Sequence, residues 1–157
     1  MEFTETKRKL FQLADKTVDK MKQHIKRGGK YNTGALYNSV GWKVIQGGIE
    51  FYVNDKYASF IISGRRKGAK QPPSWAIREW FSTPHGSRAF ANMKKKWPKI
   101  KLEGASFIVC RSIKEKGIKP FDFYNPYIEQ LYKVEAFHEL ESAFVMDVEK
   151  ELKKTIK

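Results

Sequence analysis

The sequence has one cysteine and no apolar run near the roughly 20 residues that a membrane-spanning helix needs. A single cysteine excludes an internal disulfide and is typical of a reducing compartment. Cys110 follows the apolar residues Phe107, Ile108 and Val109, so we expect a buried, unreactive thiol. The N-terminus also lacks the basic-then-apolar order of a secretion signal. These absences predict a protein made and kept in a cytoplasm, without a membrane partner.

Residues that carry chemistry are few and scattered. His24, His85 and His138 each lack a second His or Cys at ligand spacing, so no metal site is predicted. GxSxG and HExxH motifs are missing, and Gly-Arg-Arg-Lys-Gly at 64–68 lacks the spacing and the following Lys-Ser/Thr of a P-loop. We therefore expect no catalytic residue and no cofactor.

Acidic residues are nearly missing from the middle of the chain. Between Gly64 and Lys101, Glu79 is the only acid beside eleven Lys and Arg residues, so this stretch carries +10 of the formal net charge of +14. Residues 121–157 are instead acidic, at −3. Clustered positive charge attracts nucleic acid or an acidic protein surface. The bases expected to make such contacts are Arg65, Arg66, Lys67, Lys70, Lys94, Lys95 and Lys96.

The length of 157 residues, 41% of them hydrophobic, suits a single domain over residues 1–157. An amphipathic helix is predicted over residues 4–27, because apolar residues recur there at spacings of three and four before Gly28-Gly29. Its expected buried stripe consists of Leu10, Ala14, Val18, Met21 and Ile25.

A β-hairpin is predicted over residues 40–54. Val40, Trp42 and Val44 alternate with smaller or polar residues, as do the apolar residues of 49–53. The Gly47-Gly48 pair between them is the expected two-residue turn. Because an isolated hairpin is only marginally stable, its apolar face should pack on helices, or other strands or subunits should extend the sheet.

Two basic loops are expected, over residues 64–73 and 93–101, and a frayed helix end is the alternative for the second. The first contains two glycines, two prolines and four bases, a composition that no regular element tolerates. Ser74 is expected to cap the helix that follows it, and a second break is expected at Thr83-Pro84-His85-Gly86.

A C-terminal helix is predicted over residues 126–155. If unbroken it would extend about 45 Å, longer than one small domain needs, so part of it would serve another subunit. A break near Val134 is the alternative. Its expected inward stripe is Phe137, Leu140, Phe144, Val148 and Leu152. The acids Glu139, Glu141, Asp147, Glu149 and Glu151 are expected either to face solvent or to meet a basic loop of a neighbouring copy.

The order of several short motifs resembles the HK97 gene-product-10-like tail-component and neck proteins of tailed bacteriophages. After the first helix, that family has Gly-x-Leu-x-x-Ser-Ile/Val, matched here by residues 34–40. A Tyr-Ala-x-Tyr/Phe-Val/Ile-Glu-x-Gly element follows, matched at 57–64 except that Ile62 replaces the Glu. A Pro-containing basic loop leads to a helix with a Trp, here Pro73 to Trp80. In the last element, a later helix ends in Arg-x-Ile and is followed by Gly-Ile-x-Pro-x-x-Phe. The matching residues here are Arg111, Ile113, Gly117, Ile118, Pro120 and Phe123.

The resemblance implies an α+β fold, with a small antiparallel sheet and its hairpin packed against the N-terminal helix and the C-terminal helices. It implies a structural role for the matched positions, namely Gly34, Leu36, Ser39, Tyr57, Ala58, Gly64, Trp80, Arg111, Gly117 and Pro120. It also implies a virion protein without catalysis, assembled in the host cytoplasm as a six- or twelve-fold ring at the neck. Portal or adaptor and tail proteins would be its partners, and packaged double-stranded DNA would touch it transiently.

Two other hypotheses compete with a head-tail connector or tail-completion protein. A nucleic-acid-binding module would use the two basic clusters, with Trp75 or Trp97 stacking on bases. A small enzyme with a nonstandard site, such as a nuclease or a toxin, is the third. If the ring hypothesis holds, we expect most bases on protein interfaces or the outer surface, because strong attraction to DNA would impede its transit.

Overall fold

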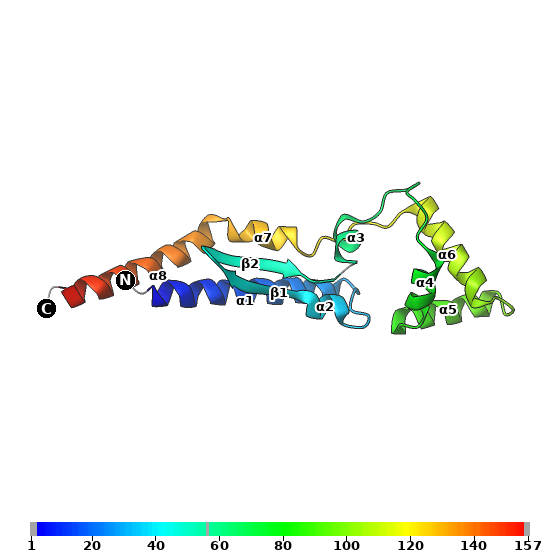
Figure 1. Cartoon of the computed structure of the whole chain (residues 1–157), viewed down its shortest axis with the longest axis horizontal. Coiled ribbons are helices and arrows are strands. Elements are labelled where there is room, and N and C mark those ends of the chain that lie inside the picture. The colour runs from blue at the N-terminus through cyan, green and yellow to red at the C-terminus, as the bar shows by residue number, and fades with distance from the viewer. Residues whose placement is uncertain (1–2, 56, 156–157) are drawn as a thin grey trace. The chain divides into compact units, whose positions relative to one another are not determined.

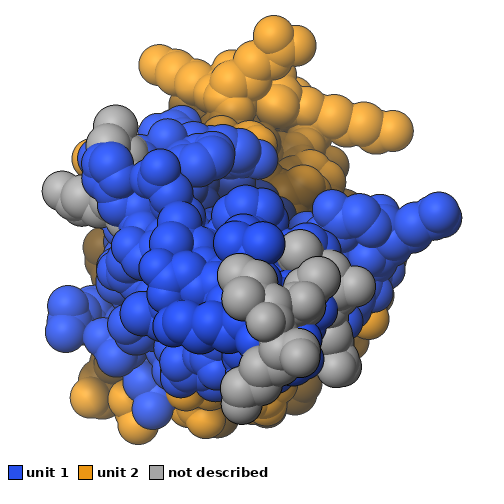
Figure 2. Space-filling view, turned by 90° about the vertical axis from the view of Figure 1, so that its left-hand side faces the viewer, with its two compact units in different colours: residues 1–28, 39–53, 123–157 blue, residues 29–38, 54–122 orange. Residues whose placement is uncertain are grey.

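The computed structural model describes residues 3–55 and 57–155, which divide into two compact units. Unit 1 comprises residues 1–28, 39–53 and 123–157, and unit 2 comprises residues 29–38 and 54–122 (Figure 2). The fold is α+β, as expected: it is rich in helix and has one two-stranded antiparallel sheet, packed against the N-terminal and C-terminal helices.

Unit 1 is built on the long helix α1 (Thr4–Arg27), which contacts β1 (Val40–Ile45), α7 (Asn125–Leu131) and α8 (Val134–Thr155) (Figure 1). The helix expected over residues 4–27 is confirmed. Its apolar stripe is buried as predicted from Ala14 to Ile25, whereas Leu10 is only half-buried. Ala14, Met21 and Ile25 are fully inaccessible to solvent. This stripe forms the core of unit 1.

The hairpin pairs β1 with β2 (Gly48–Val53) in antiparallel register, with Trp42 opposite Phe51. Its turn lies one residue earlier than predicted. Ile45 pairs with Gly48, so the two turn residues are Gln46 and Gly47, and Gly47 supplies the positive φ of 88°. Gly48 is already the first residue of β2.

One face of the hairpin packs on α1 through Trp42. The indole ring lies 5.1 Å from the ring of Phe11, and its Nε1 donates a hydrogen bond of 2.8 Å to Asp15 Oδ1. On β2, the hydroxyl of Tyr124 donates to the carbonyl oxygen of Phe51 at 3.1 Å. The hairpin is therefore tied to segments at both ends of the chain, which compensates for its small size.

The unbroken C-terminal helix predicted over residues 126–155 is wrong. α7 ends at Leu131 and α8 begins at Val134, so the alternative of a break near Val134 holds. The predicted inward stripe is also wrong at three positions: Phe137, Phe144 and Leu152 have exposed fractions of 60%, 47% and 55%. Among the side chains of this helix that the structure describes, Ala143 and Asp147 are buried instead. Ile156, which the predicted stripe could also include, lies outside the described residues.

Asp147 is buried because it caps α1. Phe3, at the N-cap of that helix, has no side-chain acceptor, which leaves the first amides without partners from their own segment. Asp147 Oδ1 accepts from the amide of Glu5 at 3.0 Å, and Oδ2 accepts from the amide and the hydroxyl of Thr6 at 2.9 and 2.8 Å. The expectation that this acid faces solvent is therefore wrong. The positive end of the α1 dipole favours the carboxylate at this position.

Unit 2 is built on α4 (Ser74–Phe81), α5 (Pro84–Lys96) and α6 (Leu102–Lys116), with α4 in contact with both other helices. The short helices α2 (Ala35–Ser39, except its last residue) and α3 (Ala58–Ser63) also belong to it. Phe81, Ala105 and Cys110 are buried in this unit. The expected burial of Cys110 is confirmed, and desolvation raises the pKa of its thiol.

Two local predictions for unit 2 are corrected. Ser74 is the first residue of α4 and makes no cap, since Pro73 occupies the N-cap. In the stretch predicted over residues 93–101 as a basic loop, or alternatively as a helix end, residues 93–96 form the last turn of α5, which begins at Pro84 after its N-cap Thr83. Thr83 Oγ1 accepts from the amide of Gly86 at 3.3 Å, and a proline fits the first helical position.

Across the described residues, no helix combines the length with the apolar composition that crossing a bilayer requires.

A candidate basic interaction surface

The positive charge of the chain is concentrated in unit 2. This unit holds seventeen Lys and Arg residues against five Asp and Glu residues, which gives it +12 of the formal +14. Lysines 94–96 occupy the last turn of α5, where the negative end of the helix dipole stabilises cations. The unit is thus a basic body joined to a nearly neutral one.

The basic loop at 65–70 is closed at its base by a short backbone clasp. Arg65 and Ile118 exchange two hydrogen bonds of 2.8 Å between their amides and carbonyl oxygens. The amide of Gly68 donates to the carbonyl of Lys114, also at 2.8 Å. The clasp fixes where the loop leaves the helices and where it returns.

Two glycines make this clasp possible. Gly64 and Gly117 have φ values of 69° and 73°, a region that other residues rarely adopt. A Cβ at Gly64 would lie 2.5 Å from the carbonyl oxygen of Ile118 and 2.7 Å from the nitrogen of Pro120, and one at Gly117 would overlap the carbonyl of Arg65. Three residues of the quoted motifs, Gly64, Gly117 and Pro120, therefore meet in space.

Arg65 serves the loop itself. Its side chain is half-buried, and Nη2 donates to the carbonyl of Lys70, which folds the loop back on its base. Arg66, Lys67 and Lys70 are exposed instead. Of the four bases predicted in this segment, three are thus available to a partner.

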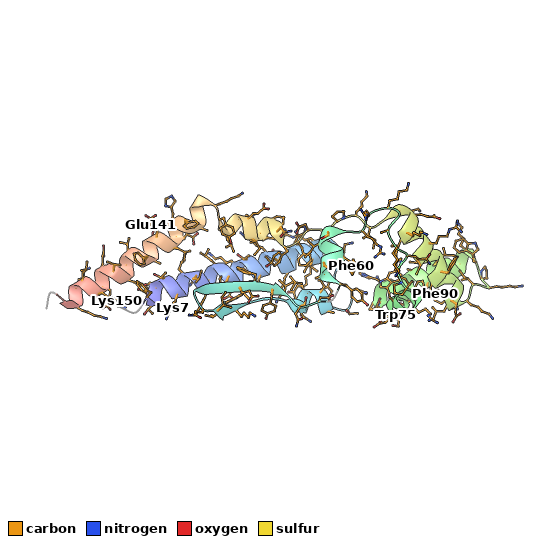
Figure 3. The ribbon with its side chains drawn as sticks, turned by 45° about the horizontal axis from the view of Figure 1, so that its top comes forward. Lys7, Phe60, Trp75, Phe90, Glu141 and Lys150 are labelled. Carbon is orange, nitrogen blue, oxygen red and sulfur yellow. The ribbon has the colours of Figure 1, made fainter. Side chains whose placement is uncertain are left out.

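The second predicted cluster, Lys94, Lys95 and Lys96, is fully exposed beside aromatic rings. The ammonium of Lys94 lies 5.1 Å from the ring centre of Phe90, labelled in Figure 3, and that of Lys96 lies 5.0 Å from Trp97. Within residues 3–55 and 57–155, none of the six exposed bases of the two clusters forms an ion pair. Their charge is available to a partner.

An open apolar pocket of about 580 Å³ lies next to this second cluster, and we call it the Trp97 pocket. Trp97 and Ile108, two of its walls, have exposed fractions of 43% and 42%. Its lining residues are Lys96, Trp97, Pro98, Lys99, Ile100 and Ile108. Sequence reasoning singled out Trp97 but missed Ile100 and Ile108. Pro98 directly follows Trp97, the C-cap of α5, and a proline there indicates that the chain leaves the helix at this point. That break was the signal in the sequence that Trp97 would not continue a buried helical face.

The remaining predicted motif residues belong to unit 2, except Ser39, which belongs to unit 1. Leu36 and Ala58 are buried, Tyr57 is exposed and Trp80 is half-buried. Gly34 has a φ of 84°. Its carbonyl oxygen accepts a hydrogen bond of 2.8 Å from the amide of Asn38, the residue before Ser39. Arg111 is exposed and bonds Glu115 Oε1 at 2.8 Å. That bond raises the pKa of Arg111 and is the main reason why the pKa of Glu115 is lowered.

A second surface with exposed apolar side chains lies on α8, and we call it the α8 stripe. It consists of Phe137, Phe144 and Leu152, which share one face of the helix because seven and eight residues separate them. Glu141, labelled in Figure 3, is four residues after Phe137 and three before Phe144 and so shares their face, and its side chain is 70% exposed. Apolar and acidic groups therefore alternate along this face.

The two surfaces differ in charge and both expose apolar side chains. Among the described residues, no cluster of three or more His, Cys, Asp or Glu side chains could hold a metal ion. What the surfaces offer is opposite charge, each combined with exposed apolar groups. A scan against protein-family models and searches of curated proteins and of solved structures give no significant match for this chain.

Proposed function

We propose that this chain is a structural virion protein of a tailed phage, a neck or tail-completion subunit that joins portal or adaptor to tail around the DNA channel. The proposal combines the motif order noted above with the geometry of the two units. Its expected state is a closed ring of identical copies, and its expected place is the neck of the particle.

The observation that carries the proposal is the presence of two unlike, complementary surfaces on one chain. Unit 2 presents exposed bases beside an apolar pocket, and α8 presents exposed apolar groups beside acids. Contact between different faces of identical subunits is head-to-tail, and such contacts produce rings when the rotation closes. Opposite charges favour the correct pairing and disfavour like faces.

The experiment that tests this function uses phage particles released by the bacterium that encodes the chain. Mass spectrometry of purified particles should detect the protein, and electron microscopy should show it as a ring on the symmetry axis between head and tail. Its absence from mature particles, or its recovery as a soluble catalyst with turnover, would contradict the proposal.

A nucleic-acid-binding module is the second candidate, favoured by the six exposed bases and by the indole of Trp97 beneath Lys96. Such a module would bind DNA tightly as an isolated protein, and its affinity would fall steeply with salt because phosphate contacts release counterions. Fluorescence anisotropy over a salt series, with the triple change Lys94→Glu, Lys95→Glu, Lys96→Glu, separates the candidates. The ring proposal predicts weak binding that this triple change hardly alters.

The bases have a predicted position within the ring. Strong positive charge lining a channel would retain the passing polyanion, so we place Arg66 and Lys67, together with Arg65, at subunit contacts or on the outer surface. A ring reconstruction with these three residues lining the lumen would refute this placement.

A further inference from the structure

We propose that the α8 stripe of one copy docks in the Trp97 pocket of a second copy, with the ring of Phe137 in the pocket and Glu141 facing Lys96. The inference rests on the proposed function, because it names the contact through which copies of the chain join. It deepens that function by assigning the two mating surfaces to particular residues.

The Trp97 pocket offers exposed apolar surface on which a large apolar side chain can pack. It is a shallow, largely open depression of about 580 Å³, and its exposed lining is mostly apolar. Exposed tryptophan in a pocket is the residue type most often found at the energetic centre of an interface. Lys96 and Lys99 on its lining select an acidic partner over a basic one.

The α8 stripe has the properties of the matching ligand. Phe137 is the most exposed of its three apolar residues, at 60%, whereas Phe144 is held against the ring of Phe3 at 5.5 Å. Glu141 lies four residues after Phe137, about one helical turn away on the same face. An aromatic ring entering the pocket therefore brings a carboxylate to its basic rim.

Glu141 has a contact within its own helix before docking. His138 Nδ1 lies 3.2 Å from Glu141 Oε2, so the carboxylate is oriented from within its own helix. Both side chains are largely exposed, at 69% and 70%, and this contact leaves room for a second cation. A pre-oriented carboxylate loses less conformational freedom when it meets a lysine.

A second copy is the occupant that the charges favour. The acidic stripe and the basic pocket belong to different units of one sequence, of which unit 2 alone carries +12. Every copy thus has one donor surface and one acceptor surface, which is what head-to-tail assembly requires. An acidic segment of another protein, or DNA, would use the pocket and leave the α8 stripe exposed.

Crosslinking of the full-length chain tests the contact directly. A photo-reactive benzoyl-phenylalanine is placed at position 137, and isotopically heavy and light protein are mixed before irradiation. We expect mixed heavy-light crosslinks between position 137 and the peptides that contain residues 96–108. Crosslinks that map to other segments, or only within one chain, would overturn the inference.

Charge exchange tests the pairing independently of crosslinking. Measured by analytical ultracentrifugation, Glu141→Lys alone or Lys96→Glu alone should raise the dissociation constant of self-association about tenfold or more. The double variant carrying both changes should recover to within about threefold of the original value. Glu129→Lys, the same charge change at an exposed position of α7, is the matched control and should leave association unchanged.

The remaining outcomes separate this inference from the proposed function. Rings in particles whose assembly is unaffected by the Phe137→Ala and Ile108→Asp changes would refute the contact and leave the virion role intact. A protein that stays monomeric up to its solubility limit, with position 137 uncrosslinked, would also refute the contact. If Lys96→Glu abolishes DNA binding and leaves self-association unchanged, the pocket is a polyanion site and the inference is wrong.

Discussion

The carboxylate of Asp147 receives both the amide and the hydroxyl of Thr6, from the opposite end of the chain. Its other oxygen receives the amide of Glu5, so one buried side chain of α8 satisfies two of the first amides of α1. An N-cap is ordinarily provided by the residue just before the helix. Here a residue near the C-terminus provides it, which couples the two longest helices of unit 1.

Replacing Asp147 by Ala should destabilise unit 1. The amides of Glu5 and Thr6 would lose their acceptor, and by analogy with other lost caps the melting temperature should fall by roughly 2–8 °C. Circular dichroism at 222 nm during heating measures this change. Glu149→Ala, an exposed acid on the same helix, is the control and should shift the melting temperature by less than about 2 °C.

The stability supplied by Asp147 should disappear in acid. Burial raises the pKa of its carboxyl, but the hydrogen bonds from Thr6 and Glu5, with the charge of Lys150, outweigh burial and hold the pKa below its ordinary value. Protonation then favours the unfolded chain, so the contribution is complete above about pH 5 and falls as pH drops below about 4. Stability should be measured against pH for the wild type and Asp147→Asn. A difference that stays constant down to pH 2 would contradict the assignment.

Gly64→Ala should disrupt the base of the basic loop. The added methyl meets both an unfavourable positive φ and the backbone of Ile118 and Pro120, so we expect a loss of roughly 3 kcal/mol in the free energy of unfolding. Gly68→Ala is the matched control within the same loop. It has a φ of 78° but open space around the new methyl, so it should cost about 1 kcal/mol. Equal losses in urea titrations would argue against a steric clasp.

Tyr124→Phe should weaken the attachment of the hairpin. The phenol is partly buried, and removing its hydroxyl leaves the carbonyl of Phe51 without that donor, which costs about 1 kcal/mol. Desolvation is also the main cause that raises the pKa of Tyr124, as expected for a phenol withdrawn from water. Urea titration should detect the loss. Tyr132→Phe, at a side chain that is 76% exposed, should be neutral.

Residue spacing in the sequence predicted α1 and the β1–β2 hairpin of unit 1, because both elements follow from the periodicity of neighbouring residues. The three- and four-residue recurrence of apolar side chains predicted α1, because a single stripe of α1 is buried from Ala14 to Ile25. Alternation gave the hairpin as well. The turn was misplaced because two consecutive glycines both tolerate a positive φ, and only the cross-strand register decides that Gly47 adopts it.

The orientation of α8 could not be obtained in this way. Its apolar residues recur at helical spacing and suggest an inward face, yet the buried side holds Ala143 and Asp147. The need for Asp147 arises at another helix, whose N-cap is Phe3 and lacks an acceptor. The sequence shows that α1 lacks a capping side chain and that α8 carries acids. It does not show that one of these acids lies at the start of α1, because that contact depends on the tertiary fold.

The sequence predicted which basic residues form the basic surface, but it did not predict the shape of that surface. Counting charges identified the two clusters, and six of the seven bases are exposed. Arg65 was assigned to a partner although it holds the loop, because composition does not tell which guanidinium folds back onto its own backbone. The Trp97 pocket requires Ile108 from the following helix and was therefore not visible as a pattern.

The clasp between Arg65 and Ile118 also sets an order of events during synthesis. The ribosome delivers Gly64 and the adjoining bases well before Gly117, since α4, α5 and α6 lie between them in the chain. Until Ile118 has left the ribosome, Arg65 lacks its backbone hydrogen-bond partner, and the basic loop is not closed at its base. The basic loop can therefore adopt its final geometry only after α4, α5 and α6 have been translated. Any contact that depends on this geometry must form later than the folding of unit 2.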